Sequence, residues 1–273
     1  MPAPGVEALG VTGVQAAARA DSAGLQLLTV SPDVDLSTAL AQLRQDPRVA
    51  YAEPNYELRA QTPPNDPRYP EQWGLDSTAG VWAEAAWADA QTQLGTASAV
   101  PVTVAVIDTG VDTAHEDLAG RLLPGDNVIT GAGAGNAADD SANGHGTHVA
   151  GIIAAETGNG IGIAGTAGTF PVSVLPVKAL DANGIGTLYD IAQGIRLSAD
   201  RGARVINLSL GARLPDYPVT LAEAVKYAQD RGALVVAAAG NDGDRVEGFY
   251  PAALPGVVSV GASGRDHHPA SFS

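Results

Sequence analysis

Val102-Thr103-Val104-Ala105-Val106-Ile107-Asp108-Thr109-Gly110 is a run of mostly β-branched residues that ends in an acid and a glycine. A continuous apolar run of this kind, without alternation, is typical of a strand buried on both faces of a parallel sheet. Open α/β sheets place their functional sites at the carboxyl ends of such strands. Asp108 is therefore the first candidate for a functional side chain.

The rest of this region alternates between strand-like and helix-like segments. Alternation of this kind predicts a parallel sheet with helices on both faces, which is a three-layer α/β domain. We expect strands at 102–107, 172–178, 204–209, 233–238 and 256–261, and helices at 146–156, 187–201 and 218–231.

A second motif follows, Asn143-Gly144-His145-Gly146-Thr147-His148-Val149-Ala150-Gly151, and it continues into an apolar stretch. It predicts a helix that carries His145 at its N-terminal end. A buried helix start rich in Gly and Ala is the alternative interpretation. Zinc binding by His145 and His148 is disfavoured. The zincin signature needs two histidines four residues apart with a Glu after the first, whereas these two are three residues apart and residue 146 is Gly.

Asp-Thr-Gly at 108–110 together with His-Gly-Thr-His-Val-Ala-Gly at 145–151 resembles the subtilisin-like serine proteases, in particular their thermitase-like members. The resemblance implies a subtilisin-like α/β fold and a serine-type endopeptidase with an Asp-His-Ser triad. It makes Asp108 the residue that orients the base and His145 the general base. It also makes Asn241, after the strand-like 235–239, the donor to the oxyanion; a simple Gly-Asn turn is the alternative.

The resemblance also implies a substrate cleft between two segments that hold an extended peptide by strand addition. One segment is Ser209-Leu210-Gly211, and the other is 181–187, which contains Gly184 and Gly186. Small residues on both sides predict broad specificity for protein and peptide substrates.

Residues 1–60 resemble an N-terminally incomplete propeptide of the inhibitor I9 type, a small α+β segment that acts as an intramolecular inhibitor. Leu25–Val30 predicts a strand, 36–44 a helix and Val49–Glu53 a second strand. The Pro-rich 61–67 is the expected linker, with maturation cleavage near 59–62, and 68–273 is the expected catalytic domain.

Calcium is the structural ion that the resemblance implies, because hard cations prefer carboxylate, amide and carbonyl oxygens. No organic cofactor is implied. For Asp66 and Asp117 the alternative interpretation is that each is an ordinary solvated acid. The implied ligands are Asp66, Asp117, Thr157, Asn159, Ile161 and Ile163.

The nucleophile of the resembled family stands in a Gly-Thr-Ser-Met-Ala type motif well after the Asn241 segment. No such motif occurs in this chain, and 269–273 resembles a stretch that precedes it in the family. We therefore expect a catalytic domain that is incomplete at its C-terminal end and inactive alone.

Two functions remain open: a serine endopeptidase of which this chain is a part, and a catalytically dead protein that binds peptides or inhibits. The presence of Asp108, His145 and Asn241 favours the first. A dinucleotide-binding domain is excluded, because the Gly-x-Gly-x-x-Gly pattern at 160–165 follows a helix and not a strand.

The composition of the chain limits the classes of molecule that it can bind. The chain has 30 acidic and 15 basic residues and a net charge of −15, which argues against nucleic acid and anionic membranes. It has no cysteine, so disulfides and thiolate metal sites are excluded. No apolar run is long enough to span a membrane. No signal peptide is visible, although the resemblance implies a secreted protein, and we expect a monomer.

Overall fold

The computed structural model describes residues 11–17, 25–55, 63–76, 78–94, 101–129 and 136–273. The chain divides into two compact units, Met1–Ala60 and Gln61–Ser273, and each is described by itself. The cleavage region expected near 59–62 lies outside the described residues.

The first unit contains a two-stranded antiparallel sheet and a helix. β1 (Val14–Ala16) pairs with β2 (Leu28–Val30), with Val14 opposite Val30. α1 (Leu36–Gln45) begins after Asp35, whose carboxylate accepts the Thr38 amide at 2.9 Å as an N-cap. The helix buries Ala39 and Leu43.

The predicted strand near 25–30 and the helix after it are confirmed, but the predicted strand at Val49–Glu53 is wrong. That segment pairs with no strand in the described part of the unit, and β2 pairs with β1 instead. The alternation at 49–53 is short, and a strand exists only where it finds a pairing edge.

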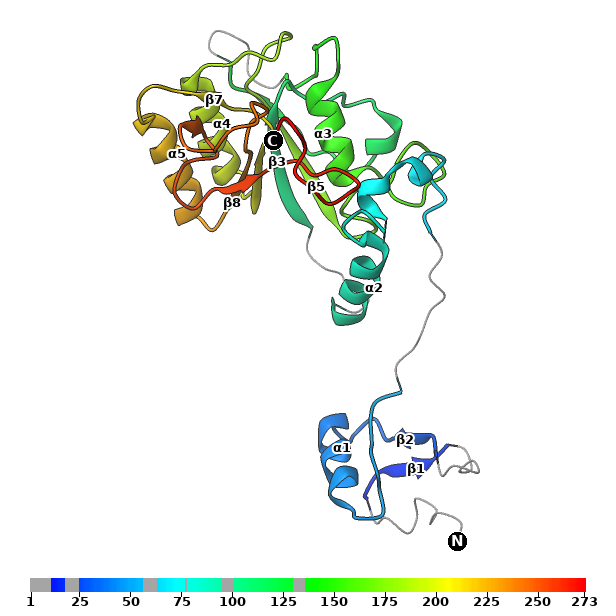
Figure 1. Ribbon diagram of the computed structural model, residues 1–273. Coiled ribbons are helices and arrows are strands. Elements are labelled where there is room, and N and C mark those ends of the chain that lie inside the picture. The colour runs from blue at the N-terminus through cyan, green and yellow to red at the C-terminus, as the bar shows by residue number, and fades with distance from the viewer. Residues whose placement is uncertain (1–10, 18–24, 56–62, 77, 95–100, 130–135) are drawn as a thin grey trace. The chain divides into compact units, whose positions relative to one another are not determined.

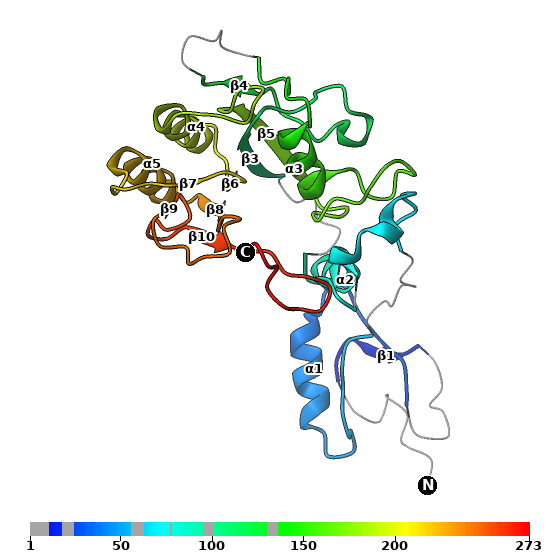
Figure 2. The ribbon, with the colours of Figure 1, turned by 45° about the horizontal axis from the view of Figure 1, so that its top comes forward.

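The second unit is built on a six-stranded parallel sheet in the order β10-β8-β6-β3-β5-β4 (Figures 1 and 2). A short antiparallel pair, β7 and β9, lies apart from it. The strands are β3 (Val102–Asp108), β4 (Asp126–Asn127), β5 (Val172–Lys178), β6 (Val205–Leu208), β7 (Ala212–Arg213), β8 (Leu234–Ala238), β9 (Phe249–Tyr250) and β10 (Val258–Val260).

The predicted strands and helices of this unit are confirmed to within one or two residues at their ends, whereas β4 and the short β7–β9 pair were not predicted. The helices are α2 (Ala83–Leu94), α3 (His145–Ala154), α4 (Leu188–Asp200) and α5 (Val219–Asp230), with single 3₁₀ turns η2 (Tyr69–Glu71), η3 (Trp73–Leu75) and η4 (Glu116–Leu118).

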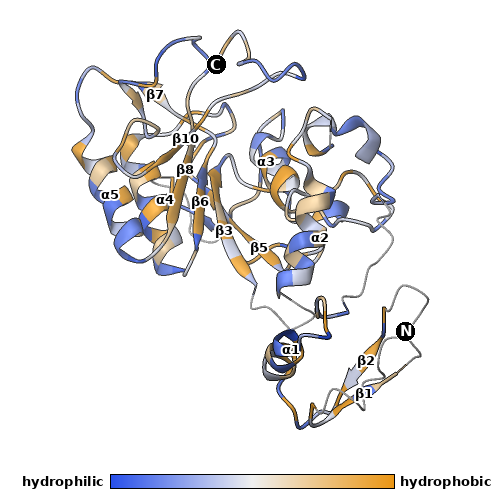
Figure 3. Ribbon diagram, turned by 60° about the horizontal axis from the view of Figure 1, so that its bottom comes forward, coloured by the Kyte–Doolittle hydropathy of each residue, from blue (hydrophilic) through white to orange (hydrophobic). Residues whose placement is uncertain are grey.

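Both faces of β3 are buried, as its β-branched run predicts. Ile107 packs in the larger core with Ile195 of α4 and Val225 of α5. Val106 packs in a separate core with Ala150 of α3. In Figure 3 the apolar strands accordingly lie between helices that turn their polar sides outward. Three layers result, and β3 is held in the middle of the sheet.

Ile195 tests the larger core. It is fully buried, and we expect Ile195→Ala to lower the free energy of unfolding by about 2–5 kcal/mol, because it leaves a cavity between α4 and the sheet. Urea unfolding followed by tryptophan fluorescence measures the change. Ile185→Ala is the control, since Ile185 is 68% exposed and its loss is expected to cost under about 0.5 kcal/mol. Equal effects of the two variants would contradict the assigned packing.

Candidate active site

Asp108 and His145 meet at the carboxyl end of the central strand. Asp108 is the last residue of β3 and is fully buried, and His145 is the first residue of α3. The Asp108 Oδ1 lies 2.7 Å from the His145 Nδ1. The Thr109 amide donates to the same oxygen at 2.7 Å. A buried carboxylate on Nδ1 orients the imidazole and selects the tautomer that leaves Nε2 free to accept a proton.

Two glycines let the helix start so close to the strand. Gly144 has a φ of 61°, a left-handed conformation that glycine adopts without steric cost, and it turns the chain into α3. A Cβ at Gly146 would lie 2.1 Å from the Gly110 carbonyl oxygen and 3.1 Å from the Asp108 Cβ. Any side chain at 146 would therefore push His145 away from Asp108.

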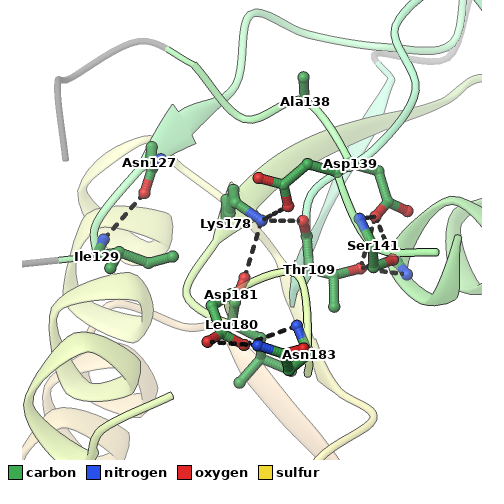
Figure 4. A network of polar contacts seen from close by, with 12 residues as sticks. Thr109, Asn127, Ile129, Ala138, Asp139, Ser141, Lys178, Leu180, Asp181 and Asn183 are labelled. Atoms are coloured by element: carbon green, nitrogen blue, oxygen red, sulfur yellow. Dashed lines mark hydrogen bonds and ion pairs between the residues drawn. The ribbon is translucent and has the colours of Figure 1, made fainter. Parts of the chain in front are cut away.

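A second carboxylate, Asp139, ties the end of β3 to the start of α3. It accepts hydrogen bonds from the Thr109 hydroxyl at 3.0 Å, from the Ser141 hydroxyl at 2.6 Å, and from both the amide and the hydroxyl of Thr147 at 3.1 and 2.6 Å. The Thr109 hydroxyl in turn accepts the Gly146 amide at 2.9 Å. Figure 4 shows Asp139, Ser141 and Thr109 in this network.

The protonation of Asp139 follows from these contacts. Partial burial opposes its ionisation, but the hydrogen bonds from Ser141 and Thr147 outweigh that effect and lower the pKa of Asp139 to about 2. Asp139 therefore stays charged at neutral pH, next to the N-terminus of α3, where a negative charge is favourable.

A cavity of about 410 Å³ opens beside His145. Of the residues predicted for the substrate cleft, Gly184, Ser209, Leu210 and Gly211 line it together with His145. Gly186 is exposed but is not among the residues that line the cavity, and a Cβ at this position would lie 2.4 Å from the Ala179 carbonyl oxygen. Ala182 and Asn183, from the same predicted segment as Gly184, line the cavity as well. The further lining residues, which the sequence did not single out for this cleft, are Thr109, Ala142, Asn143 and Leu180.

Asn241 follows Gly240 at the carboxyl end of β8 and is not part of the cavity lining. Phe249 lies between this segment and the cleft. Its ring would be 3.0 Å from a Cβ at Gly240 and 2.4 Å from a Cβ at Gly211. Sequence reasoning missed Phe249, since β9 contains only two residues and has no periodic pattern.

The residues predicted for calcium gather around the loop 157–163. Asp117 and Asp66 are only 3% and 2% exposed. The side-chain amide of Asn159 donates to Asp117 at 3.0 Å, and its backbone amide donates to Asp66 at 3.2 Å, so that one residue joins the two acids. The Ile163 amide donates to Asp117 at 2.9 Å. Thr157 is buried in the same loop, and Ile161 completes it.

The residue types of this set suit a hard cation, because carboxylate, amide and carbonyl oxygens are the ligands that Ca²⁺ prefers. In this structure the two buried carboxylates accept hydrogen bonds from N–H groups of the loop, which include the Gly158 backbone amide and the Asn159 side chain. A Cβ at Gly162 would lie 2.2 Å from an Asp117 carboxylate oxygen, so the loop needs glycine to come this close. Among the described residues, this loop included, no group of three or more His, Asp or Glu side chains is placed to hold a metal ion.

Comparison with known proteins decides the family. Residues 101–273 match the sequence model of peptidase S8, the subtilase family. The chain belongs to the subtilase family. Residues 6–55 of this subtilase match the fervidolysin N-terminal prodomain, so the predicted resemblance of the N-terminal segment to a propeptide is confirmed.

Two relatives and one solved structure are similar to this chain in sequence or in fold. The thermophilic serine proteinase of Bacillus sp. (strain AK1) is 44% identical over 241 residues, which cover 88% of this chain and 55% of that protein. Thermitase of Thermoactinomyces vulgaris is 39% identical over 77% of the chain and 69% of its own length. A protease from Pseudoalteromonas arctica PAMC 21717 superposes with a TM-score of 0.68 at 35% identity, over 77% of this chain and 69% of that one.

These similarities confirm two predictions from the sequence, namely that the chain is a thermitase-like subtilase and that it has the subtilisin-like α/β fold. The subtilase chain described here spans about half the length of the Bacillus relative.

Asp139 yields a pH-dependent prediction. Its pKa in the folded protein is about 2, below the ordinary value near 3.9, so its contribution to stability is present above about pH 4 and is lost as the pH falls toward 2. We expect Asp139→Asn to lower the free energy of unfolding by about 1 kcal/mol at pH 6, after allowance for solvent screening, and by less at pH 3. Urea unfolding at the two pH values measures this.

The matched control is Asp216→Asn, which removes an exposed carboxylate away from the network. It should leave the stability nearly unchanged at both pH values. A deficit of Asp139→Asn that is the same at pH 3 as at pH 6 would show that the charge of Asp139 does not stabilise the fold.

Proposed function

We propose that this subtilase chain carries the acid and the base of a serine endopeptidase that hydrolyses peptide bonds in proteins. The observation that supports this most strongly is the 2.7 Å contact between Asp108 and the His145 Nδ1. Asp108 is fully buried, whereas the side chain of His145 is 42% exposed and lines the cavity. The geometry thus leaves the far side of the imidazole open to a nucleophile.

In this proposal His145 takes the proton of a serine hydroxyl as it attacks the scissile carbonyl, and then gives it to the leaving amine. Asp108 stabilises the imidazolium that forms in between. Asn241, at the end of β8, donates its side-chain amide to the oxyanion. The 273 residues contain no Gly-Thr-Ser-Met-Ala motif, so we expect hydrolysis only in a protein that also supplies this serine.

The substrate is proposed to be an extended peptide between Gly184 and the segment 209–211. Both segments offer backbone groups at the rim of the cavity, which suits strand addition. Residues 1–60 are proposed to act as the intramolecular inhibitor of this cleft, with 61–67 as the linker; the match of 6–55 to a prodomain supports this. We further propose a monomeric catalytic domain.

The proposed location is extracellular. The printed name of one relative, an extracellular protease of Xanthomonas campestris that is 37% identical over the whole of this chain, supports it. None of the helices in the described residues combines the length and the apolar character that a bilayer span requires.

Calcium is proposed to occupy the loop of residues 157–163 with Asp66 and Asp117. The two carboxylates would be joined there by the Asn159 side-chain oxygen and by the carbonyl oxygens of Thr157, Ile161 and Ile163. Its role would be structural, since it would fasten the segment around Asp66 to the loop that follows α3.

The catalytic assignment is tested on the full-length protein with a chromogenic peptide. We expect His145→Ala to lower kcat by about 10⁴–10⁶-fold, because the base is lost, and Asn241→Ala to lower it by about 10²–10³-fold, because one oxyanion donor is lost. His268→Ala is the control, since His268 is exposed and lies outside the cavity lining. If the unaltered protein binds the peptide without cleaving it, the alternative of a catalytically dead peptide-binding protein is correct.

The calcium site is tested by thermal unfolding. Calcium at 100 times its Kd should add about 2.7 kcal/mol to the stability of the folded protein, and a chelator should remove this gain. We expect Asp117→Asn to abolish the response to calcium, with magnesium as the ion control. The same midpoint with calcium and with chelator would contradict the site.

A further inference from the structure

Lys178 is a buried lysine beside the candidate active site. It is the last residue of β5, where the parallel register places it opposite Asp108 of β3. Its side chain is only 5% exposed. The chain contains one other lysine, Lys226 on α5, whose side chain is 72% exposed. Lysine is almost never buried to this extent without partners, so the position calls for an explanation.

The ammonium group uses all of its hydrogen-bonding capacity. It donates to the Thr109 carbonyl oxygen at 2.6 Å, to the Asp140 Oδ1 at 2.7 Å and to the Leu180 carbonyl oxygen at 2.9 Å. A lysine ammonium has three N–H donors and no acceptor, so three acceptors satisfy it completely. Figure 4 shows Lys178 at the centre of this network, with contacts that radiate to Thr109 and to Leu180.

Each of the three acceptors belongs to a different part of the site. Thr109 directly follows Asp108 at the end of β3. Leu180 lines the cavity beside His145. Asp140 adjoins Asp139, whose carboxylate holds Thr147 in the first turn of α3. One cation therefore connects the strand of the acid, the loop before the base and the edge of the cleft.

Packing alone does not require a lysine here. A buried ammonium must be desolvated, and that cost is repaid only by good hydrogen bonds. The single carboxylate partner, Asp140, has a side chain that is 63% exposed, so this ion pair is screened by water. Two of the three bonds go to backbone carbonyls, and these bonds hold the backbone of 109 and 180 in place.

We propose that Lys178 is a positioning residue of this site: it holds the backbone at Thr109 and Leu180 so that Asp108 stays aligned with His145 and the cleft edge stays at a fixed distance from both. The proposal rests on the proposed function for its effect on catalysis. Its structural part, the alignment of the Asp108–His145 pair, can be measured without any hydrolysis.

The experiment compares Lys178→Met, Lys178→Arg and Lys226→Met in the full-length protein. Met keeps the apolar stem without the donors, Arg restores charge and donors, and Lys226→Met removes the exposed lysine as the control. The first readout is the NMR signal of the His145 Nδ1 proton and its exchange with water, assigned by its loss in His145→Ala. The second is the separate measurement of kcat and KM.

For Lys178→Met we expect cooperative unfolding, at least about tenfold faster exchange of the His145 Nδ1 proton, and a kcat lowered about 10–100-fold, since displacement of catalytic groups by about 1 Å can cost 10²-fold. Lys178→Arg should recover most of both losses, and Lys226→Met should change neither. A folded Lys178→Met variant with the exchange rate of the unaltered protein overturns the proposal.

Two further outcomes are informative. If Lys178→Met does not fold, Lys178→Gln decides, because the shorter amide has only two N–H donors and cannot hold all three acceptors; the exchange rate of the unaltered protein in that variant overturns the proposal. If no variant, nor the unaltered protein, hydrolyses peptides, the proposed function fails, while the exchange measurement still supports or overturns the role of Lys178 in alignment.

Discussion

The pairing of β3 with β5 on one side and β6 on the other is the constraint on which the second unit depends. All three strands are parallel, so their carboxyl ends lie at one edge of the sheet. Helices cover both faces, which leaves that edge as the place where polar groups of β3 can reach solvent. Asp108, Lys178 and Ser209 are therefore neighbours because their strands are neighbours, although 101 positions separate the first from the last.

Burial of charge at that edge has a cost, which hydrogen bonds offset. Asp108 is fully buried, and within the described part of the chain one of its carboxylate oxygens has no hydrogen-bond partner. Its other oxygen takes bonds from Thr109 and His145. Around this pair, Asp139 collects donors from the start of α3, and Lys178 supplies donors to carbonyls. Asp139 as an acceptor and Lys178 as a donor thus hold the segments on which Asp108 and His145 stand.

Local patterns predicted much of this arrangement. The β-branched run predicted a strand buried on both faces, and the apolar stretch after the second motif predicted a helix that carries His145 at its N-terminal end. They could not predict the contacts that depend on which strands are neighbours. Lys178 illustrates this, since its three acceptors come from separate segments of the chain. Val49–Glu53 illustrates the same limit, because its alternation met no pairing strand.

The order of buried strands and helices could be predicted from the amino-acid sequence, because it depends on periodicity and on local conformation. The position of Asp108 after a buried strand followed from the same pattern, whereas its pairing with His145 was implied by the resemblance of their two motifs to a known family. The three-dimensional fold was needed to show that Lys178 and Asp139 both bind Thr109, next to Asp108. Their positions follow from parallel register and from the packing of distant segments, and hydrogen bonds between residues 38 and 69 positions apart leave no periodic trace in the chain.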